Sequence, residues 1–170
     1  GGRVWGTLWE HAFSRFGLAV PKGLPEAMRG TTGDAALATI RAHAGDGVDA
    51  SEIFEAFYEI AEERFSQGAE KKPGLDELLA YLAQAGLPLA VASSSPQAIV
   101  RTNLERAGVR PYFAEVVHGR EVAHSKPAPD IFLEAARRLG TKPADTLVLE
   151  DSPAGVRAGA AGGFKTVMVP

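Results

Sequence analysis

The chain has 170 residues, of which 45% are hydrophobic and 23% are charged. These values are ordinary for one globular domain, or for one core with a sizeable insertion. The formal net charge of −3 gives no support for binding to nucleic acid or to a membrane surface, and no apolar run is long enough to span a bilayer. Cysteine is absent, which excludes disulfides, thiolate catalysis and cysteine-ligated zinc. We expect a cytoplasmic protein that is a monomer or a weak homodimer.

Residues 1–72 show helical patterns and no strand pattern. Apolar residues recur at helical spacing from Leu8 to Phe16, Asp34 can cap a second helix, and Ser51 is expected to cap a long amphipathic one. The long helix carries an aromatic stripe that includes Phe54, Phe57 and Tyr58. Such a stripe indicates core or interhelix packing rather than a cofactor site. Residues 1–72 are therefore predicted to form a separate helical unit.

The pattern changes at Pro73-Gly74, a strong breaker, after which helices and short apolar strands alternate. Strands are expected within residues 87–92, 112–118, 146–149 and 165–169, with helices at 75–85, 97–107 and 130–139. Strict alternation of this kind favours a parallel sheet with right-handed crossovers. The predicted fold class is therefore α/β, with a parallel-sheet core at 73–170 and a helical unit at 1–72.

Two adjacent carboxylates, Glu150 and Asp151, directly follow the apolar strand at 146–149. Open α/β sheets bind ligands beyond the carboxyl ends of their strands, and adjacent acids repel each other unless a cation neutralises them. Mg²⁺ suits such a pair, because it takes one or two carboxylates and keeps waters or phosphate as its other ligands. The alternative is that Asp151 merely caps the next helix.

Two further polar clusters follow other strands or the loops after them. The hydroxyls of Ser93, Ser94 and Ser95 come where a strand gives way to a helix, which suits an anion such as phosphate. Lys126 precedes two prolines that stiffen its loop, and a lysine held in this way can act as a point charge on phosphate. The alternatives are simple helix capping by serine and a solvated loop lysine. The occurrence of all three clusters on one α/β pattern favours a phosphate site.

These motifs resemble those of the haloacid dehalogenase superfamily, in particular its phosphatase and β-phosphoglucomutase-like branch. The matching segments are residues 92–95, the Ser-Lys-Pro-Ala-Pro-Asp run at 125–130, and Glu-Asp-Ser-Pro-Ala-Gly-Val at 150–156. The resemblance implies a helical cap on a Rossmann-like core. It also implies that Ser93, with Ser94, binds the transferring phosphoryl group, that Lys126 neutralises its charge, and that Arg29 faces the substrate. Glu150 and Asp151 would hold Mg²⁺.

One motif of the superfamily has no counterpart in this sequence. Its chemistry begins with Asp-x-Asp-Gly-Thr, whereas Arg3 and Trp5 stand where an alignment on Gly6-Thr7 would put the two acids. Aligning residues 9–17 with the first cap helix instead places the motif, and a strand from the middle of the sheet, outside this sequence. Loss of that strand would leave two neighbouring strands unpaired. We therefore expect the chain to be part of a longer enzyme.

The resemblance implies a Mg²⁺-dependent phosphatase that acts on a small phosphorylated metabolite of the sugar-phosphate or phosphoglycolate type. The reaction would pass through an aspartyl-phosphate whose aspartate is absent from this chain. Two alternatives remain open at this point. One is a β-phosphoglucomutase-like sugar-phosphate mutase, and the other is a non-catalytic protein that keeps the site for phosphate binding.

Overall fold

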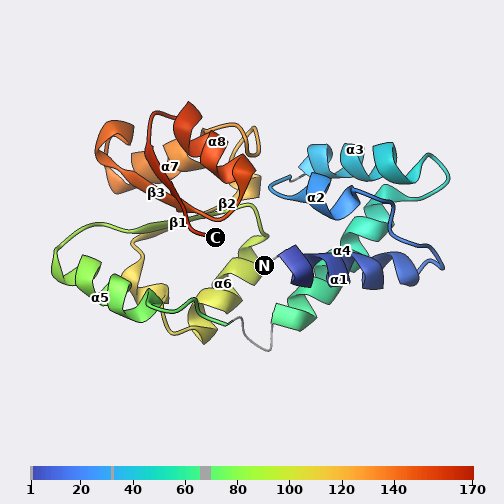
Figure 1. Ribbon diagram of the computed structural model, residues 1–170, viewed down its shortest axis with the longest axis horizontal. Helices are drawn as coiled ribbons and strands as arrows, with labels where there is room; N and C mark the ends of the chain where they lie inside the picture. The colour runs from blue at the N-terminus through green and yellow to red at the C-terminus, as the bar shows by residue number, and fades with distance from the viewer. Residues whose placement is uncertain (1, 32, 66–69) are drawn as a thin grey trace.

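The structure is a computed structural model that describes residues 2–31, 33–65 and 70–170, in a helical part and an α/β part (Figure 1). The carboxyl end of the chain lies in the α/β part, below the strands in this view. The helical part contains α1 (Gly2–Ser14), α2 (Leu24–Met28), α3 (Gly33–Ala44) and α4 (Ala50–Phe65). The prediction of helices without strands in this segment agrees with the elements found there.

The helical part has a closed apolar core. Phe13, Leu24, Ile40 and Ile53 are at most 1% exposed and belong to one cluster, which also includes Ile99 of the α/β part. The beginning of α4 differs from the sequence-based prediction, because the carboxylate of Asp49 accepts the backbone N–H groups of residues 51 and 52 at 3.0 and 3.2 Å. Asp49, two residues earlier than the expected serine, therefore caps this helix.

The α/β part alternates helices and strands as the sequence predicts. Its elements are α5 (Leu75–Gln84), β1 (Ala90–Ser93), α6 (Gln97–Arg106), β2 (Glu115–His118), α7 (Asp130–Leu139), β3 (Leu147–Glu150), α8 (Pro153–Ala161) and β4 (Lys165–Met168). The pairs β1–β2 and β3–β4 are both parallel. The expected parallel α/β class is thereby confirmed. In Figure 1, α7 and α8 lie on one side of the strands, with α5 and α6 on the other.

In the part of the chain that the structure describes, the strands form two parallel pairs, β1–β2 and β3–β4, that are not hydrogen-bonded to each other. Ser93 is opposite His118 in one ladder and Glu150 is opposite Met168 in the other. Within the described residues, β1 and β3 each have one hydrogen-bonded neighbour, so no ladder joins the two pairs. This division agrees with the expectation that two neighbouring strands of the sheet each lack a partner on one side.

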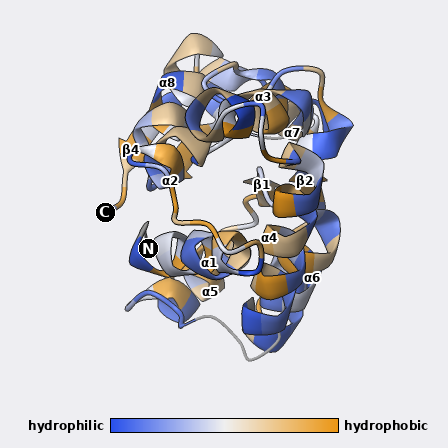
Figure 2. Cartoon of the chain, turned by 90° about the vertical axis from the view of Figure 1, so that its right-hand side faces the viewer, coloured by the Kyte–Doolittle hydropathy of each residue, from blue (hydrophilic) through white to orange (hydrophobic). Residues whose placement is uncertain are grey.

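The second apolar cluster lies on the α7 and α8 side of the strands. It includes Val117 of β2, Ile131 and Phe132 of α7, and Val148 of β3. The alternate residues of β3 and β4 point the other way, and Leu147, Leu149 and Val167 are between 47% and 57% exposed. In Figure 2, the chain from β4 to the carboxyl end is coloured largely as hydrophobic. One face of the β3–β4 sheet is thus apolar but uncovered.

None of the helices in the described ranges is both long and apolar enough to cross a membrane.

Candidate active site

A cavity of about 570 Å³ lies at the boundary between the helical and α/β parts. Every residue that the sequence analysis assigned to phosphate or metal binding lines it: Arg29, Ser93, Ser94, Lys126, Glu150 and Asp151. They come from the end of α2, from the carboxyl ends of β1 and β3, and from the loop before α7. The fold therefore brings these residues together at one place, although Arg29 and Asp151 are 122 positions apart in the sequence.

Lys126 and Glu150 form a buried ion pair at the base of this cavity. The Lys126 Nζ atom lies 2.7 Å from Glu150 Oε2, and the two side chains are only 8% and 9% exposed. The same Nζ lies 4.8 Å from the centre of the Phe132 ring, a favourable position for a cation. Burial acts to raise the pKa of Glu150, but the hydrogen bond and charge of Lys126 outweigh it, so this pKa lies below its usual value. Lys126 is therefore a fixed positive charge, not a solvated loop lysine.

The remaining carboxylate oxygen of Glu150 organises the loop that follows β3. Oε1 accepts the backbone N–H of Asp151 at 2.9 Å and that of Ser152 at 3.3 Å. The Glu150 side chain occupies the space beside Gly155, where a Cβ atom would lie 1.9 Å from the carboxyl carbon. Glycine at 155 is thus required for the carboxylate to lie in this position.

Ser152, and not Asp151, caps helix α8. Its hydroxyl oxygen accepts the backbone N–H of Gly155 at 3.0 Å, and Pro153 occupies the first turn. The alternative that Asp151 is present as a helix cap is therefore wrong. Asp151 is exposed and lines the cavity beside Glu150.

The serine cluster after β1 does not cap its helix either. The residue at the N-cap of α6 is Pro96, with no side-chain hydrogen bond, whereas the Ser93 hydroxyl accepts the backbone N–H of Ser95 at 3.2 Å. All three serines are half-buried and line the cavity. A compact turn of hydroxyls and N–H groups at the end of a parallel strand is suited to binding a phosphate.

The donor atoms beside the cavity fit a hard divalent cation. In the parts of the chain that the structure describes, no group of three or more His, Cys, Asp or Glu side chains gathers to hold a metal. Glu150 and Asp151 supply carboxylate oxygens, and Mg²⁺ is usually bound by one or two carboxylates with water and phosphate completing its shell. Because Oε2 of Glu150 is engaged by Lys126, Asp151 is the more accessible of the two donors.

Arg29 reaches the site from the helical part. It follows α2 as the C-cap residue, is exposed, and lines the cavity. The next residue, Gly30, has a φ of +77°, and a Cβ there would lie 3.5 Å from that of Lys126 and 3.6 Å from that of Ala154. The helical part thus touches the lysine loop and α8 at Gly30, which brings Arg29 to the cavity that Lys126 also lines.

The aromatic side of the cavity was not predicted from the sequence. Trp5, Phe54 and Tyr58 are half-buried and line it, although the stripe on α4 was interpreted as packing alone. The residues at 54 and 58 are one helical turn apart, so the stripe extends beyond the buried face that Ile53 and Phe57 occupy. An aromatic stripe that is wider than the buried face of α4 is the sequence feature that could have indicated this side of the cavity.

The chain is similar in sequence to a known protein family and to several characterised proteins. The family model for haloacid dehalogenase-like hydrolases matches residues 4–163. Hexitol phosphatase A of Escherichia coli is 32% identical over 163 residues, which cover 95% of this chain and 73% of that protein. The bifunctional riboflavin kinase/FMN phosphatase of Arabidopsis thaliana is 46% identical over 99 residues, or 58% of this chain.

Among solved structures, a mutant of CbbY from Rhodobacter sphaeroides in complex with xylulose-1,5-bisphosphate has a TM-score of 0.83 at 25% identity. The match covers 99% of this chain and 79% of that one. Several curated relatives are longer, and the chain spans 26% to 52% of the length of three of them. The family match nevertheless extends over nearly the whole sequence and includes both sides of the cavity. This chain belongs to the haloacid dehalogenase-like hydrolase family.

Proposed function

We propose that the chain supplies the phosphate-binding and metal-binding part of a Mg²⁺-dependent phosphatase for a small phosphorylated metabolite. The observation that carries this proposal is the buried Lys126–Glu150 pair, which lines the same cavity as the Ser93 turn and Asp151. A buried lysine beside strand-end hydroxyls is suited to an anion with several oxygens. The family match and the phosphatases among the relatives support this chemistry.

In this proposal, the phosphoryl oxygens are bound by the hydroxyl of Ser93 and the backbone N–H groups around Ser94. Lys126 offsets negative charge on those oxygens during transfer, and its fixed position means that little reorganisation is needed. Glu150 acts on the substrate through Lys126, which it positions. Bound Mg²⁺, held by Asp151 with Glu150, would neutralise further charge on the phosphoryl group.

The nucleophile is the part of the reaction that this sequence does not contain. We propose that an aspartate of an Asp-x-Asp segment outside the sequence attacks phosphorus, on a strand that pairs with β1 and β3. Both of those strands have one hydrogen-bonded neighbour within the described residues, and their carboxyl ends carry Ser93 and Glu150. The attack by this aspartate would break the P–O bond to the ester's alcohol, which leaves with a proton, and water would then hydrolyse the aspartyl-phosphate to release phosphate. One difficult displacement would thus become two easier ones.

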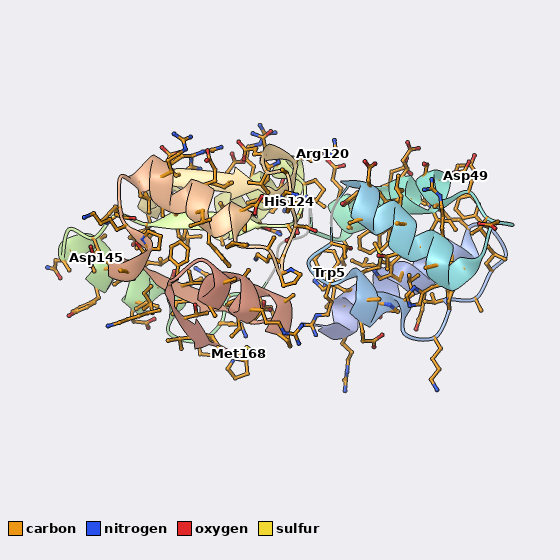
Figure 3. The ribbon with its side chains drawn as sticks, turned by 90° about the horizontal axis from the view of Figure 1, so that it is seen from above. Trp5, Asp49, Arg120, His124, Asp145 and Met168 are labelled. Carbon is orange, nitrogen blue, oxygen red and sulfur yellow. The ribbon has the colours of Figure 1, made fainter. Side chains whose placement is uncertain are left out.

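Phosphate release from para-nitrophenyl phosphate tests this function in a protein that includes the Asp-x-Asp segment. We expect turnover with Mg²⁺, loss of turnover with EDTA, and a decrease on the order of 100-fold for Asp151→Asn, since a metal contributes several kcal/mol to transition-state stabilisation. Asp145→Asn is the matched control, because Asp145 is exposed and lies far from the cavity (Figure 3). Unchanged Mg²⁺ dependence in Asp151→Asn would contradict the metal assignment.

The relatives leave the organic part of the substrate open. One is named for hexitol phosphates, which are flexible polyols, and another for FMN, whose ring system is flat. Both esters present the same phosphate to the site, so the residues around Lys126 do not distinguish between them. The other side of the cavity must do so.

A further inference from the structure

The two sides of the cavity differ in chemistry. The α/β side carries hydroxyls, a lysine and carboxylates, as described above. The helical side carries five aromatic residues and one methionine: Trp5, Trp9, Met28, Phe54, Phe57 and Tyr58. In Figure 3, Trp5 lies on the side of the helical part that faces the α/β part. A phosphate bound at Lys126 would thus direct its ester group toward aromatic rings.

These aromatic residues form two layers. The rear layer is Trp9 stacked on Phe57, with ring centres 3.8 Å apart at an angle of 10° and exposures of 3% and 5%. The front layer consists of the half-buried Trp5, Phe54 and Tyr58. Trp5 lies 5.6 Å from Phe57, and Phe54 meets Tyr58 edge-on at 4.4 Å. The rear layer therefore holds the front rings in place while these remain accessible from the cavity.

Hydrogen-bonding groups are few on this side. Besides the aromatic residues, the polar side chains that line it from the described part of α1 to α4 are Arg29 and Thr31, and the Thr31 hydroxyl donates to the Met28 carbonyl at 2.8 Å. Burial raises the pKa of the Tyr58 phenol, against the smaller opposing effect of Arg120, so this hydroxyl is neutral. A polyol chain would find few side-chain partners for its hydroxyls on this side, so it would gain little affinity from polar contacts there.

We propose, on the basis of the function proposed above, that the physiological ester carries a flat heteroaromatic ring and that Trp5, Phe54 and Tyr58 bind this ring. Every heteroaromatic ring presents a π face that can pack on such side chains. The cavity of about 570 Å³ is of the size that proteins use for ligands of this class. The three front residues then set substrate specificity, while the α/β side binds the phosphate common to all esters.

Riboflavin 5′-phosphate and ribitol 5-phosphate provide the test, because they share the phosphate and the five-carbon chain and differ in the ring. Calorimetric titration of the protein in Mg²⁺ should show riboflavin 5′-phosphate binding about 5- to 150-fold more tightly, the range expected for stacking of one base on aromatic side chains. Inorganic phosphate, titrated separately, reports the phosphate site alone. Equal affinities for the two esters would overturn the inference.

Phe54→Leu and Tyr58→Leu identify the side chains responsible. Each keeps an apolar group at a half-buried position and removes the ring, so each should reduce the preference for riboflavin 5′-phosphate while leaving the affinity for inorganic phosphate unchanged. Tyr81→Leu is the matched control, since Tyr81 is 68% exposed on α5 and does not line the cavity. A preference that is retained in both cavity variants would contradict the role of these rings.

The outcomes separate this inference from the proposed function. If all the phosphate compounds bind with similar affinity, the phosphate site remains and the aromatic specificity is wrong. If no compound binds, both proposals are wrong. If riboflavin without phosphate binds as tightly as riboflavin 5′-phosphate, the aromatic residues act without Lys126 and the inferred single site is overturned.

Discussion

The helical and α/β parts both contribute to one cavity, but they differ in how completely each buries its own apolar surface. The helical part encloses Phe13, Leu24 and Ile40 almost completely. The α/β part leaves Leu147 and Leu149 about half exposed on one face of a two-stranded sheet. The helical part can thus hold its aromatic rings by packing alone, whereas the α/β part fixes its functional side chains through hydrogen bonds and one ion pair.

The largest expected effect compares an apolar residue from each part. Phe13→Ala should lower the free energy of unfolding by about 3–5 kcal/mol, because it opens a cavity in a closed core. Leu149→Ala should lower it by less than about 1 kcal/mol, because that side chain is 48% exposed. Urea unfolding measures both. A cost for Leu149→Ala equal to that for Phe13→Ala would mean that another segment covers this face in solution.

Breaking the Lys126–Glu150 ion pair tests how much this charge interaction contributes to the stability of the α/β part and to its binding of phosphate. Lys126→Ala leaves the Glu150 carboxylate buried without its partner, so it should destabilise the protein by about 3 kcal/mol and greatly weaken binding of inorganic phosphate. The double variant Lys126→Met with Glu150→Leu should recover most of the stability but not the phosphate binding. Urea unfolding and phosphate titration check the two effects separately. Phosphate affinity that survives in the double variant would exclude Lys126 from the site.

A smaller effect is expected from Gly155→Ala, which adds a single methyl group. Its Cβ would overlap the Glu150 carboxyl group at 1.9 Å, so the side chain must move, at a cost of about 1–3 kcal/mol. Gly6→Ala is the matched control, because nothing lies within 4 Å of its Cβ position in helix α1 and alanine favours helix by about 0.5–1 kcal/mol. The midpoint of thermal unfolding should therefore fall for Gly155→Ala and rise for Gly6→Ala. If Gly155→Ala instead stabilised the protein, the Glu150 side chain would not be held against Gly155.

The sequence predicted where the candidate site residues of the α/β part would lie, because these residues follow strands. Ser93, Lys126 and Asp151 were identified from their positions after predicted strands or in stiff loops, and the alternation of elements implied that these positions meet. The structure places all of them at the cavity. Local pattern and three-dimensional position agree here, since the carboxyl ends of parallel strands lie at the same edge.

The features that the sequence did not predict depend on contacts between distant segments. Tyr58 belongs to an amphipathic stripe, and periodicity alone does not distinguish a ring buried in the core from one that faces a cavity. Glu150 was assigned to metal, but its partner, Lys126, is 24 residues away. The division of the strands into two pairs was expected only from the family resemblance, because composition and alternation do not determine which strands pair.

The smallest expected effect is a pH dependence of stability. It would arise from the ion pair of the α/β part and not from the apolar core of the helical part. Because the pKa of Glu150 is lower in the folded protein than its ordinary value near 4.5, the unfolded chain binds a proton here more readily. The contribution of Glu150 to stability is therefore complete above that value and is lost as pH falls through its lower folded pKa. Glu134, whose pKa is lowered to about 2 by hydrogen bonds from Arg137 and Arg138, acts in the same direction.

The Glu150→Gln variant separates the contribution of Glu150 from that of other acids. Its unfolding free energy, measured by urea titration from pH 6 down to pH 3, should fall less steeply than that of the unaltered protein. Glu77→Gln, on an exposed position of α5, controls for the loss of one carboxylate and should leave the slope unchanged. Identical slopes in all three proteins would mean that Lys126 does not stabilise the ionised form of Glu150, and the α/β part would then depend on apolar packing as the helical part does.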